Sequence, residues 1–386
     1  MKIKILVRIL WPAGTQRIAI LQTKALQNMG HDVELVFLRS TEKGERYYHD
    51  LLNGVNYRTL HRKNDSLLVS LYDYITEIFM SDRKGEGRVD YNFIRDFWKY
   101  LKNDEPELLV CHDQWAGLAG YYAKKKLGTR YIVFLHERAA DFPWVKGIKR
   151  PLAKLALRYT DKILKNADAL FAVTDAVSKT FEELHGLRVV TDFPGLSLYS
   201  GMSHEREDFL VAISNWSKVK FPDMYLHLMK ELPQERLIMA GNWVDERYEH
   251  EFKQKVANEG LEKRVIIIGN ISEEQKHELL LKAKAFVRFG LGEYGVATGT
   301  LEALEHLTPV IVNDELGISG MIEEKNLGFV IKRNDYSSVR SFLINLKDRE
   351  FRDGLIRNMT NFVVENSWEK SVNKIISVVE KGVDFK

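Results

Sequence analysis

Glycines and hydroxyl-bearing residues gather in one stretch of the second half of the chain, FVRFGLGEYGVATGTLEALEHLTPVIV. Its glycines and threonines are Gly290, Gly292, Gly295, Thr298, Gly299 and Thr300. Glycines let the backbone approach a ligand, threonine hydroxyls can donate to phosphate oxygens, and the positive end of the following helix favours a diphosphate. The stretch therefore predicts a nucleoside diphosphate site. The alternative is a loop with capping threonines and no ligand.

Charged and polar side chains flank this stretch. Glu293 lies in the loop and Glu302 in the helical run. Carboxylates there cannot hold phosphate, but they can accept hydrogen bonds from ribose or sugar hydroxyls. Asn215 and Lys220 follow the first predicted strand of the second half, where a lysine can neutralise diphosphate charge. A solvated charge is the alternative for Glu293 and for Lys220.

Polar side chains also follow two consecutive predicted strands of the first half. LLVCHDQW ends its strand with His112 and Asp113, and YIVFLHER ends its strand with His136 and Glu137. Such strand ends line the ligand-binding edge of a parallel sheet, and histidine can orient a hydroxyl or carry a proton near neutral pH. We expect catalytic roles for His136 and for Glu293 of the glycine-rich stretch, and acceptor-side positions for His112, Asp113 and Glu137. A satisfied polar residue at a strand end is the alternative.

The loop after the first predicted strand, WPAGTQ, supplies Gly14 but lacks the G-x-G-x-x-G spacing of dinucleotide-binding enzymes. Gly14 either lets backbone amides approach a phosphate or sugar, or forms a tight turn.

Several function classes lack their motifs in this sequence. No C-x-x-C pair, H-E-x-x-H run or D-x-D pair beside a strand is present, so we expect no metal and no cofactor apart from the donor substrate. The G-x-S-x-G elbow of hydrolases and the Walker loop are also missing. The 57 basic and 54 acidic residues nearly balance, which gives little reason to expect a nucleic acid partner.

The elements that must position these residues alternate between strands and helices. The first half contains the apolar runs IKILVRIL, VELVFL, LLVCH, RYIVFLH and ALFAVT, and the second half contains FLVAIS, RLIMAG, RVIIIG, AFVRF, PVIV and GFVI. Runs that are apolar on both faces suit a parallel sheet with helices on each side. We predict an α/β protein with two doubly wound, Rossmann-like domains facing a central cleft, joined by a linker within residues 192–208.

Size and composition agree with two folded domains. The chain has 386 residues, of which 45% are hydrophobic and 29% charged. Cys111 lies in an apolar run and is expected to be a buried, inert thiol. The N-terminal segment is a predicted strand, not a secretory signal, and no stretch reaches the roughly 20 apolar residues of a membrane span. We expect a cytoplasmic protein.

The order of these features resembles glycosyltransferase family 4 over almost the whole chain. The segments that carry the resemblance are ALQNMGHDVELV, DALFAVTDAVSKTF, RVIIIGNISEEQKHELLLKAKAFV, LEALEHLTPVIV and SWEKSVNKIISVVE. The resemblance implies a GT-B fold, with an acceptor-side domain over 1–198, a donor domain over 205–366, and a C-terminal helix at about 367–386 that packs back on the first domain. It also implies a retaining, metal-independent, hexosyltransferase-like enzyme that uses a nucleotide sugar.

The resemblance also assigns roles. His136 matches a histidine beside the transferred sugar, Lys220 a lysine on the donor diphosphate, and Glu302 a glutamate on the ribose. The base-recognition turn is matched by Gly269, Asn270 and Ile271.

The sequence departs from the family pattern at the donor site. Asn215 stands where the family usually has an arginine, and Glu293 lies nine positions before Glu302 in place of eight. Our hypothesis is that Arg288 restores the missing positive charge.

The acceptor is a glycan, a lipid-linked compound or a small molecule. The stretch from Trp144 to Lys165 combines apolar and basic residues, so it could contact an anionic membrane peripherally, at the inner face, or be an ordinary surface helix. Two other functions stay open: a nucleotide-sugar epimerase-like enzyme and a non-catalytic partner with the same fold.

Overall fold

A computed structural model describes residues 1–62, 97, 100–139, 150–199, 206–217, 220–333 and 335–381. The chain divides into two compact units. The amino-terminal unit comprises Met1–Gly195 and Trp368–Lys386, and the carboxyl-terminal unit comprises Leu196–Ser367. Trp144 of the predicted membrane-contacting stretch lies outside the described residues.

The amino-terminal unit is built on a parallel sheet of seven strands in the order β3-β2-β1-β4-β5-β6-β7. The strands are β1 (Lys2–Leu10), β2 (Asp32–Ser40), β3 (Tyr57–Arg62), β4 (Leu108–His112), β5 (Arg130–Leu135), β6 (Ala169–Ala172) and β7 (Val190–Thr191). Every residue of β4 is buried, including Cys111, as its apolar sequence predicts. Burial raises the pKa of the Cys111 thiol, so the thiol stays protonated and inert.

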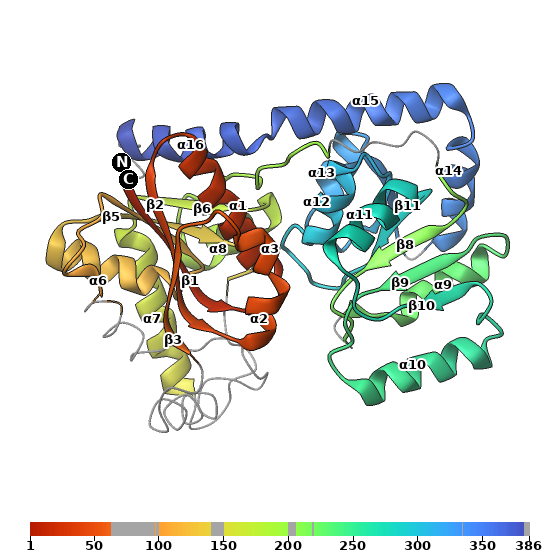
Figure 1. Cartoon of the computed structure of the whole chain (residues 1–386), viewed down its shortest axis with the longest axis horizontal. Coiled ribbons are helices and arrows are strands. Elements are labelled where there is room, and N and C mark those ends of the chain that lie inside the picture. Colours follow the sequence, from red (N-terminus) through yellow and green to blue (C-terminus); the bar gives the residue numbers. More distant parts are fainter. Residues whose placement is uncertain are drawn as a thin grey trace. The chain divides into compact units, whose positions relative to one another are not determined.

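Helices connect these strands. They are α1 (Gly14–Asn28), α2 (Glu42–Tyr47), α3 (His49–Leu52), α6 (Gly117–Leu127), α7 (Arg150–Asn166) and α8 (Asp175–His185), and the C-terminal helix α16 (Trp368–Lys381) belongs to the same unit. Figure 1 shows α16 next to α1, and the two helices are in contact. Val372, Ile375 and Val379 of α16 are buried in the core that contains Ile3 and Ile20, so α16 completes the hydrophobic core of this unit.

The carboxyl-terminal unit contains a second parallel sheet, of six strands in the order β10-β9-β8-β11-β12-β13. These strands are β8 (Leu210–Ile213), β9 (Leu237–Ala240), β10 (Val265–Ile267), β11 (Ala285–Arg288), β12 (Val310–Asn313) and β13 (Gly328–Ile331). The order places the first strand, β8, between β9 and β11, which is the switch point of a doubly wound sheet. The predicted Rossmann-like architecture is confirmed for both units.

The helices of this unit are α9 (Asp223–Glu231), α10 (Glu246–Asn258), α11 (Glu273–Lys282), α12 (Thr298–Glu305), α13 (Ser319–Glu324), α14 (Val339–Asn345) and α15 (Arg349–Glu365), with a short 3-10 helix at Tyr336–Ser338. In Figure 1, α10 lies on one side of strands β8, β9 and β10, and α12 and α13 lie on the other. A capping box begins α11: Ser272 and Gln275 exchange hydrogen bonds between side chain and backbone. This exchange fixes where α11 begins.

No helix of the described residues is long and apolar enough to cross a membrane.

Because one face of α16 is buried, we predict that shortening a side chain on that face lowers the stability of the protein strongly. Ile375→Ala should lower the free energy of unfolding by about 2–5 kcal/mol, because it leaves a cavity in the core of the amino-terminal unit. Urea denaturation followed by circular dichroism measures this. Ile344→Ala is the matched control, since Ile344 is 58% exposed. Equal effects of the two substitutions would contradict the packing.

Candidate functional site

The glycine-rich loop predicted from the sequence joins β11 to α12 at the carboxyl end of the second sheet. It is fastened at two points. The Asn313 side-chain amide accepts from the Gly290 amide (3.0 Å) and donates to its carbonyl (2.8 Å). The Gly317 amide donates to the Glu293 carbonyl (2.7 Å), and a Cβ on Gly317 would lie 1.9 Å from the Tyr294 carbonyl oxygen. Gly317 therefore has to be a glycine, and Asn313 and Gly317 are site residues that the sequence reasoning missed.

The loop ends at the amino terminus of α12, where Thr298 and Gly299 are the first two helical residues. Ala297 precedes them with φ 47°, and no side chain caps the helix. A Cβ on Gly299 would lie 3.1 Å from the Phe286 ring. Thr300 is completely buried, and its hydroxyl has no hydrogen-bond partner among the described residues. A buried hydroxyl without a partner is costly, so this helix start has the character of a site that receives a polar ligand.

A carboxylate between two cations dominates the electrostatics of the loop. Glu293 Oε2 lies 2.6 Å from Arg288 Nη2, and Glu293 Oε1 lies 2.9 Å from Lys220 Nζ. Arg288 is 4% exposed, and the Lys220 side chain is 28% exposed. Two positive charges share one negative charge, so the cluster keeps a net positive charge.

The sheet register explains how Arg288 comes to this cluster. Strands β8 and β11 are neighbours, with Phe286 opposite Val211. Continuing that register places Arg288 beside Ile213, the last residue of β8 and two positions before Asn215. Arg288 therefore extends from the strand next to the one that leads to Asn215. The half-buried Asn215 itself has no positive charge.

Glu302, in α12, is brought to the start of α11. It is 8% exposed, and its Oε1 lies 2.8 Å from the Nζ of Lys276, which is 4% exposed. Lys276 also contacts Glu273 Oε1 at 2.7 Å. The sequence reasoning missed Lys276, because its position within a polar helix start gives no sign of burial.

The predicted base-recognition turn lies between β10 and α11. Gly269 and Asn270 are exposed and Ile271 is half-buried. The Gly269 carbonyl accepts from the Gly241 amide (3.0 Å), which ties the turn to the end of β9. The turn thus leads directly into α11, the helix that carries Lys276.

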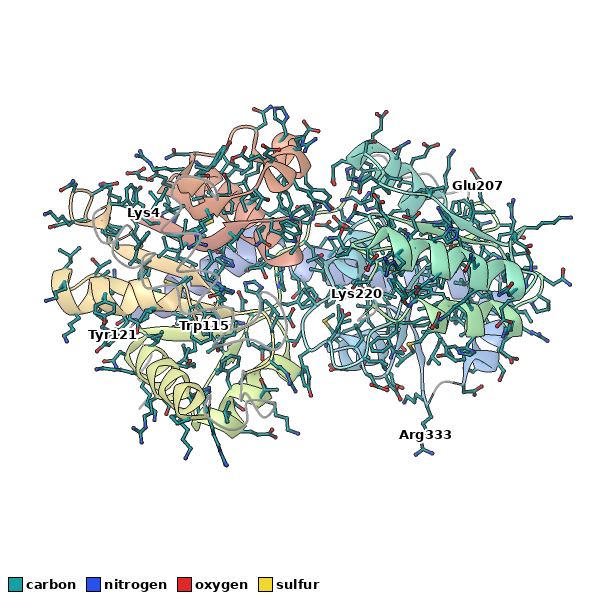
Figure 2. The ribbon with its side chains drawn as sticks, turned by 90° about the horizontal axis from the view of Figure 1, so that it is seen from below. Lys4, Trp115, Tyr121, Glu207, Lys220 and Arg333 are labelled. Carbon is teal, nitrogen blue, oxygen red and sulfur yellow. The ribbon has the colours of Figure 1, made fainter. Side chains whose placement is uncertain are left out.

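A separate cavity of ≈ 630 Å³ lies at the opposite edge of this sheet. Asp208, Lys284 and Pro309 line it, and each precedes a strand of the sheet. Figure 2 shows Glu207, which also lines the cavity, well apart from Lys220. The cavity is therefore distinct from the glycine-rich loop.

In the amino-terminal unit, His112 and His136 form a buried chain with Gln22. His112 Nδ1 lies 2.8 Å from His136 Nε2, and His112 Nε2 lies 3.0 Å from Gln22 Oε1. With that amide oxygen as the acceptor, His112 donates from Nε2 and accepts at Nδ1 from His136 Nε2. This tautomer leaves Nδ1 of His136 as a hydrogen-bond acceptor. Gln22 is a further residue that the sequence reasoning missed.

Burial keeps both rings neutral. It lowers the pKa of His136 to about 3, and burial together with the neighbouring His136 lowers the pKa of His112 well below its ordinary value. His136 can therefore orient a hydroxyl, but it is a poor proton carrier near neutral pH.

Asp113 takes part in local structure. Its Oδ1 accepts from the amides of Trp115 and Ala116 (both 2.7 Å), and its Oδ2 accepts from Arg8 Nε (2.7 Å). Its φ of 90° lies in the region that favours glycine. These interactions shape the turn after β4, which supports a structural role. Glu137 follows β5 and is exposed.

Gly14 is the first residue of α1, and neither a side-chain cap nor an acidic residue occupies the first turn of this helix. The start of α1 thus combines the positive end of the helix dipole with a residue that lacks a side chain. No group of three or more His, Cys, Asp or Glu residues in the described part of the chain could hold a metal ion.

Comparisons with known proteins identify the class. Residues 13–191 match the model of the glycosyl transferase 4-like domain, and residues 201–362 match the model of glycosyl transferases group 1. The two matches cover most of the chain, so it belongs to the glycosyltransferases of the family 4 type. No curated protein matches the sequence significantly.

Solved structures show the same GT-B fold. HepE of Anabaena, crystallised with UDP and glucose, has a TM-score of 0.74 at 14% identity, over 99% of this chain and 100% of that chain. Sucrose-phosphate synthase of Thermosynechococcus elongatus has a TM-score of 0.73 at 14% identity, over 99% of each chain. The lipopolysaccharide outer core galactosyltransferase WaaB has a TM-score of 0.65 at 16% identity, over 97% of this chain and 99% of that chain.

The buried histidines predict a specific pH dependence of stability. A group whose pKa is lower in the folded state binds fewer protons when folded, so its contribution to stability falls as pH drops below its unfolded pKa of 6.5 towards the folded value of about 3. His136→Asn should therefore flatten the loss of stability below pH 6.5, by up to about 1.4 kcal/mol per pH unit. Urea denaturation at several pH values measures this.

His49→Asn is the control, because the His49 side chain is 84% exposed. The pH profile of this variant should follow that of the unmodified protein. A profile of His136→Asn that is equally unchanged would contradict the burial of a neutral imidazole.

Proposed function

We propose that this glycosyltransferase moves a hexosyl unit from a nucleotide-diphosphate sugar to a glycan, lipid-linked or small-molecule acceptor, with retention of configuration and without a metal ion. The observation that carries the proposal is the pair of cations, Arg288 and Lys220, on Glu293 in the loop that leads to the uncapped start of α12. A diphosphate carries the charge that this cluster and helix end attract. Retention follows from the family resemblance.

The donor would use the loop as follows. The diphosphate binds the α12 amides and Lys220, with Thr300 as a hydroxyl donor, and Arg288 supplies the charge that Asn215 lacks. Glu302 accepts from the ribose, and the turn at Gly269 receives the base. HepE was crystallised with UDP and glucose, which supports UDP as the first nucleotide to test.

Glu293 and His136 would act on the sugar and the acceptor. Glu293 accepts hydrogen bonds from sugar hydroxyls, while Arg288 and Lys220 fix its carboxylate. His136 accepts a hydrogen bond from a hydroxyl group at Nδ1. It does not take up the proton, because its pKa is about 3. The leaving diphosphate, as the family resemblance implies, takes the acceptor proton, so the cations that stabilise its charge would promote transfer.

Nucleotide binding tests the proposal directly. UDP, GDP and ADP are screened by thermal shift in a buffer with EDTA, since a ligand that binds the folded state raises the melting temperature. One nucleotide should raise it, and Lys220→Ala or Arg288→Ala should abolish the shift. Lys253→Ala should retain it, because the Lys253 side chain is 51% exposed on α10.

A rescue variant separates charge from shape. Adding Asn215→Arg to Arg288→Ala should restore part of the shift, because it returns a positive charge to the end of the adjacent strand β8. Absence of any shift in the unmodified protein would favour the non-catalytic partner. Release of an altered sugar from the donor without an acceptor would favour the epimerase-like enzyme.

We also propose that α7 contacts an anionic membrane surface. Its basic residues recur at helical spacing and are exposed: Arg150, Lys154, Arg158, Lys162 and Lys165. Thr160, Ile163 and Leu164 are buried on the other side of the helix. A basic face on a surface helix attracts anionic lipid head groups.

Liposome pelleting at low salt tests this contact. Lys154→Gln with Arg158→Gln should weaken binding to phosphatidylglycerol vesicles by about 30-fold, at about 1 kcal/mol for each charge. The matched control is Lys253→Gln with Lys255→Gln, which removes two half-exposed lysines from α10. No binding by the unmodified protein would remove the membrane contact from the proposal.

A further inference from the structure

Lys276 is a buried ammonium group at an unfavourable place in its helix. It is 4% exposed and lies in the first turns of α11, directly after the capping box of Ser272 and Gln275. Burying an ammonium group is costly, and the positive end of a helix repels a cation. The ion pairs with Glu302 and Glu273 offset this cost. An apolar residue at this buried position would avoid both penalties, so the lysine calls for a functional explanation.

The two carboxylates beside Lys276 differ in their surroundings. The Glu302 side chain is 10% exposed, and the Glu273 side chain is 34% exposed. Water can solvate Glu273 without the lysine, whereas Glu302 depends on a protein partner for its charge. The contact with Glu302 is therefore the one that Lys276 affects most.

Lys276 also connects two parts of the candidate donor site. Its helix follows the turn at Gly269–Ile271, and its ammonium group reaches across to Glu302 in α12. The capping box fixes where α11 begins and so fixes the position of Lys276. The ion pair then sets the position of the Glu302 Oε1 atom relative to that turn.

We propose that Lys276 is a positioning residue that orients the Glu302 carboxylate towards the ribose of the donor, and that it thereby makes the site select ribonucleotides over deoxyribonucleotides. The proposal rests on the proposed function, in which Glu302 accepts from the ribose. A site built to hydrogen-bond a hydroxyl rejects an analogue without it, because a buried polar group is then left unpaired. Without Lys276 the Glu302 carboxylate should be less well oriented, and the site should discriminate less against deoxyribonucleotides.

The experiment compares paired nucleotides by isothermal titration calorimetry. The probes are UDP and 2′-deoxy-UDP, with the corresponding GDP and ADP pairs. The unmodified protein should prefer the ribonucleotide by about tenfold or more, as expected for a hydrogen bond to a charged group. In Lys276→Met this preference should shrink to about threefold or less, mainly through weaker binding of the ribonucleotide.

Matched variants separate positioning from folding. Glu302→Gln should shrink the preference in the same way, and adding Lys276→Met to it should change little more, because both residues act through one carboxylate. Lys276→Arg should keep most of the preference. Lys282→Met, a half-exposed lysine on the same helix, should keep all of it.

The outcomes are distinguishable. A folded Lys276→Met or Glu302→Gln variant that binds UDP with an unchanged preference for ribose would overturn the positioning role. If Lys276→Met does not fold, Lys276→Gln takes its place in the same measurement, because it also removes the charge that pairs with Glu302. Failure of the unmodified protein to bind UDP, GDP or ADP would instead contradict the proposed function.

Discussion

The organisation of the glycine-rich loop depends on one ionic contact, the Glu293 carboxylate held between Arg288 and Lys220. A guanidinium as buried as that of Arg288 cannot lack a counter-charge without a large loss of stability. The contact therefore joins the end of β11, the segment after β8 and the glycine-rich loop. Because Asn313 holds Gly290 as well, the cations and loop amides are set before any ligand arrives, and little ordering cost remains for binding.

In the amino-terminal unit, the buried polar chain at the ends of β4 and β5 carries no charge. His112, His136 and Gln22 satisfy one another in the interior, and burial holds both imidazoles neutral. The direction of each hydrogen bond in this chain is set by the next group, so the orientation of His136 depends on residues from α1 and β4. The carboxyl-terminal unit thus contains a cationic cluster, whereas the amino-terminal unit contains a neutral polar chain.

Sequence reasoning found every strand of the second sheet and the interior strands of the first sheet, but it missed β3 and β7, the two edge strands of the first sheet. Runs such as LLVCH are apolar on both faces because helices cover both sides of a central strand. The edge strands β3 and β7 lack that signature because β3 (YRTLHR) is mostly polar and β7 has only two residues. Likewise, the position of Lys276 in a polar stretch could not reveal its burial, which depends on Glu302, 26 positions away.

The departure from the family pattern at Asn215 also shows what a sequence motif cannot predict. A motif compares positions along the chain, whereas a ligand responds to charge at a point in space. Strands β8 and β11 are separated by more than 70 residues in the sequence and are hydrogen-bonded neighbours in the sheet. Our hypothesis that Arg288 supplies the charge missing at Asn215 accordingly places the arginine on the neighbouring strand and not at the matching position of the motif. The guanidinium of Arg288 is buried, and the Glu293 carboxylate supplies its counter-charge.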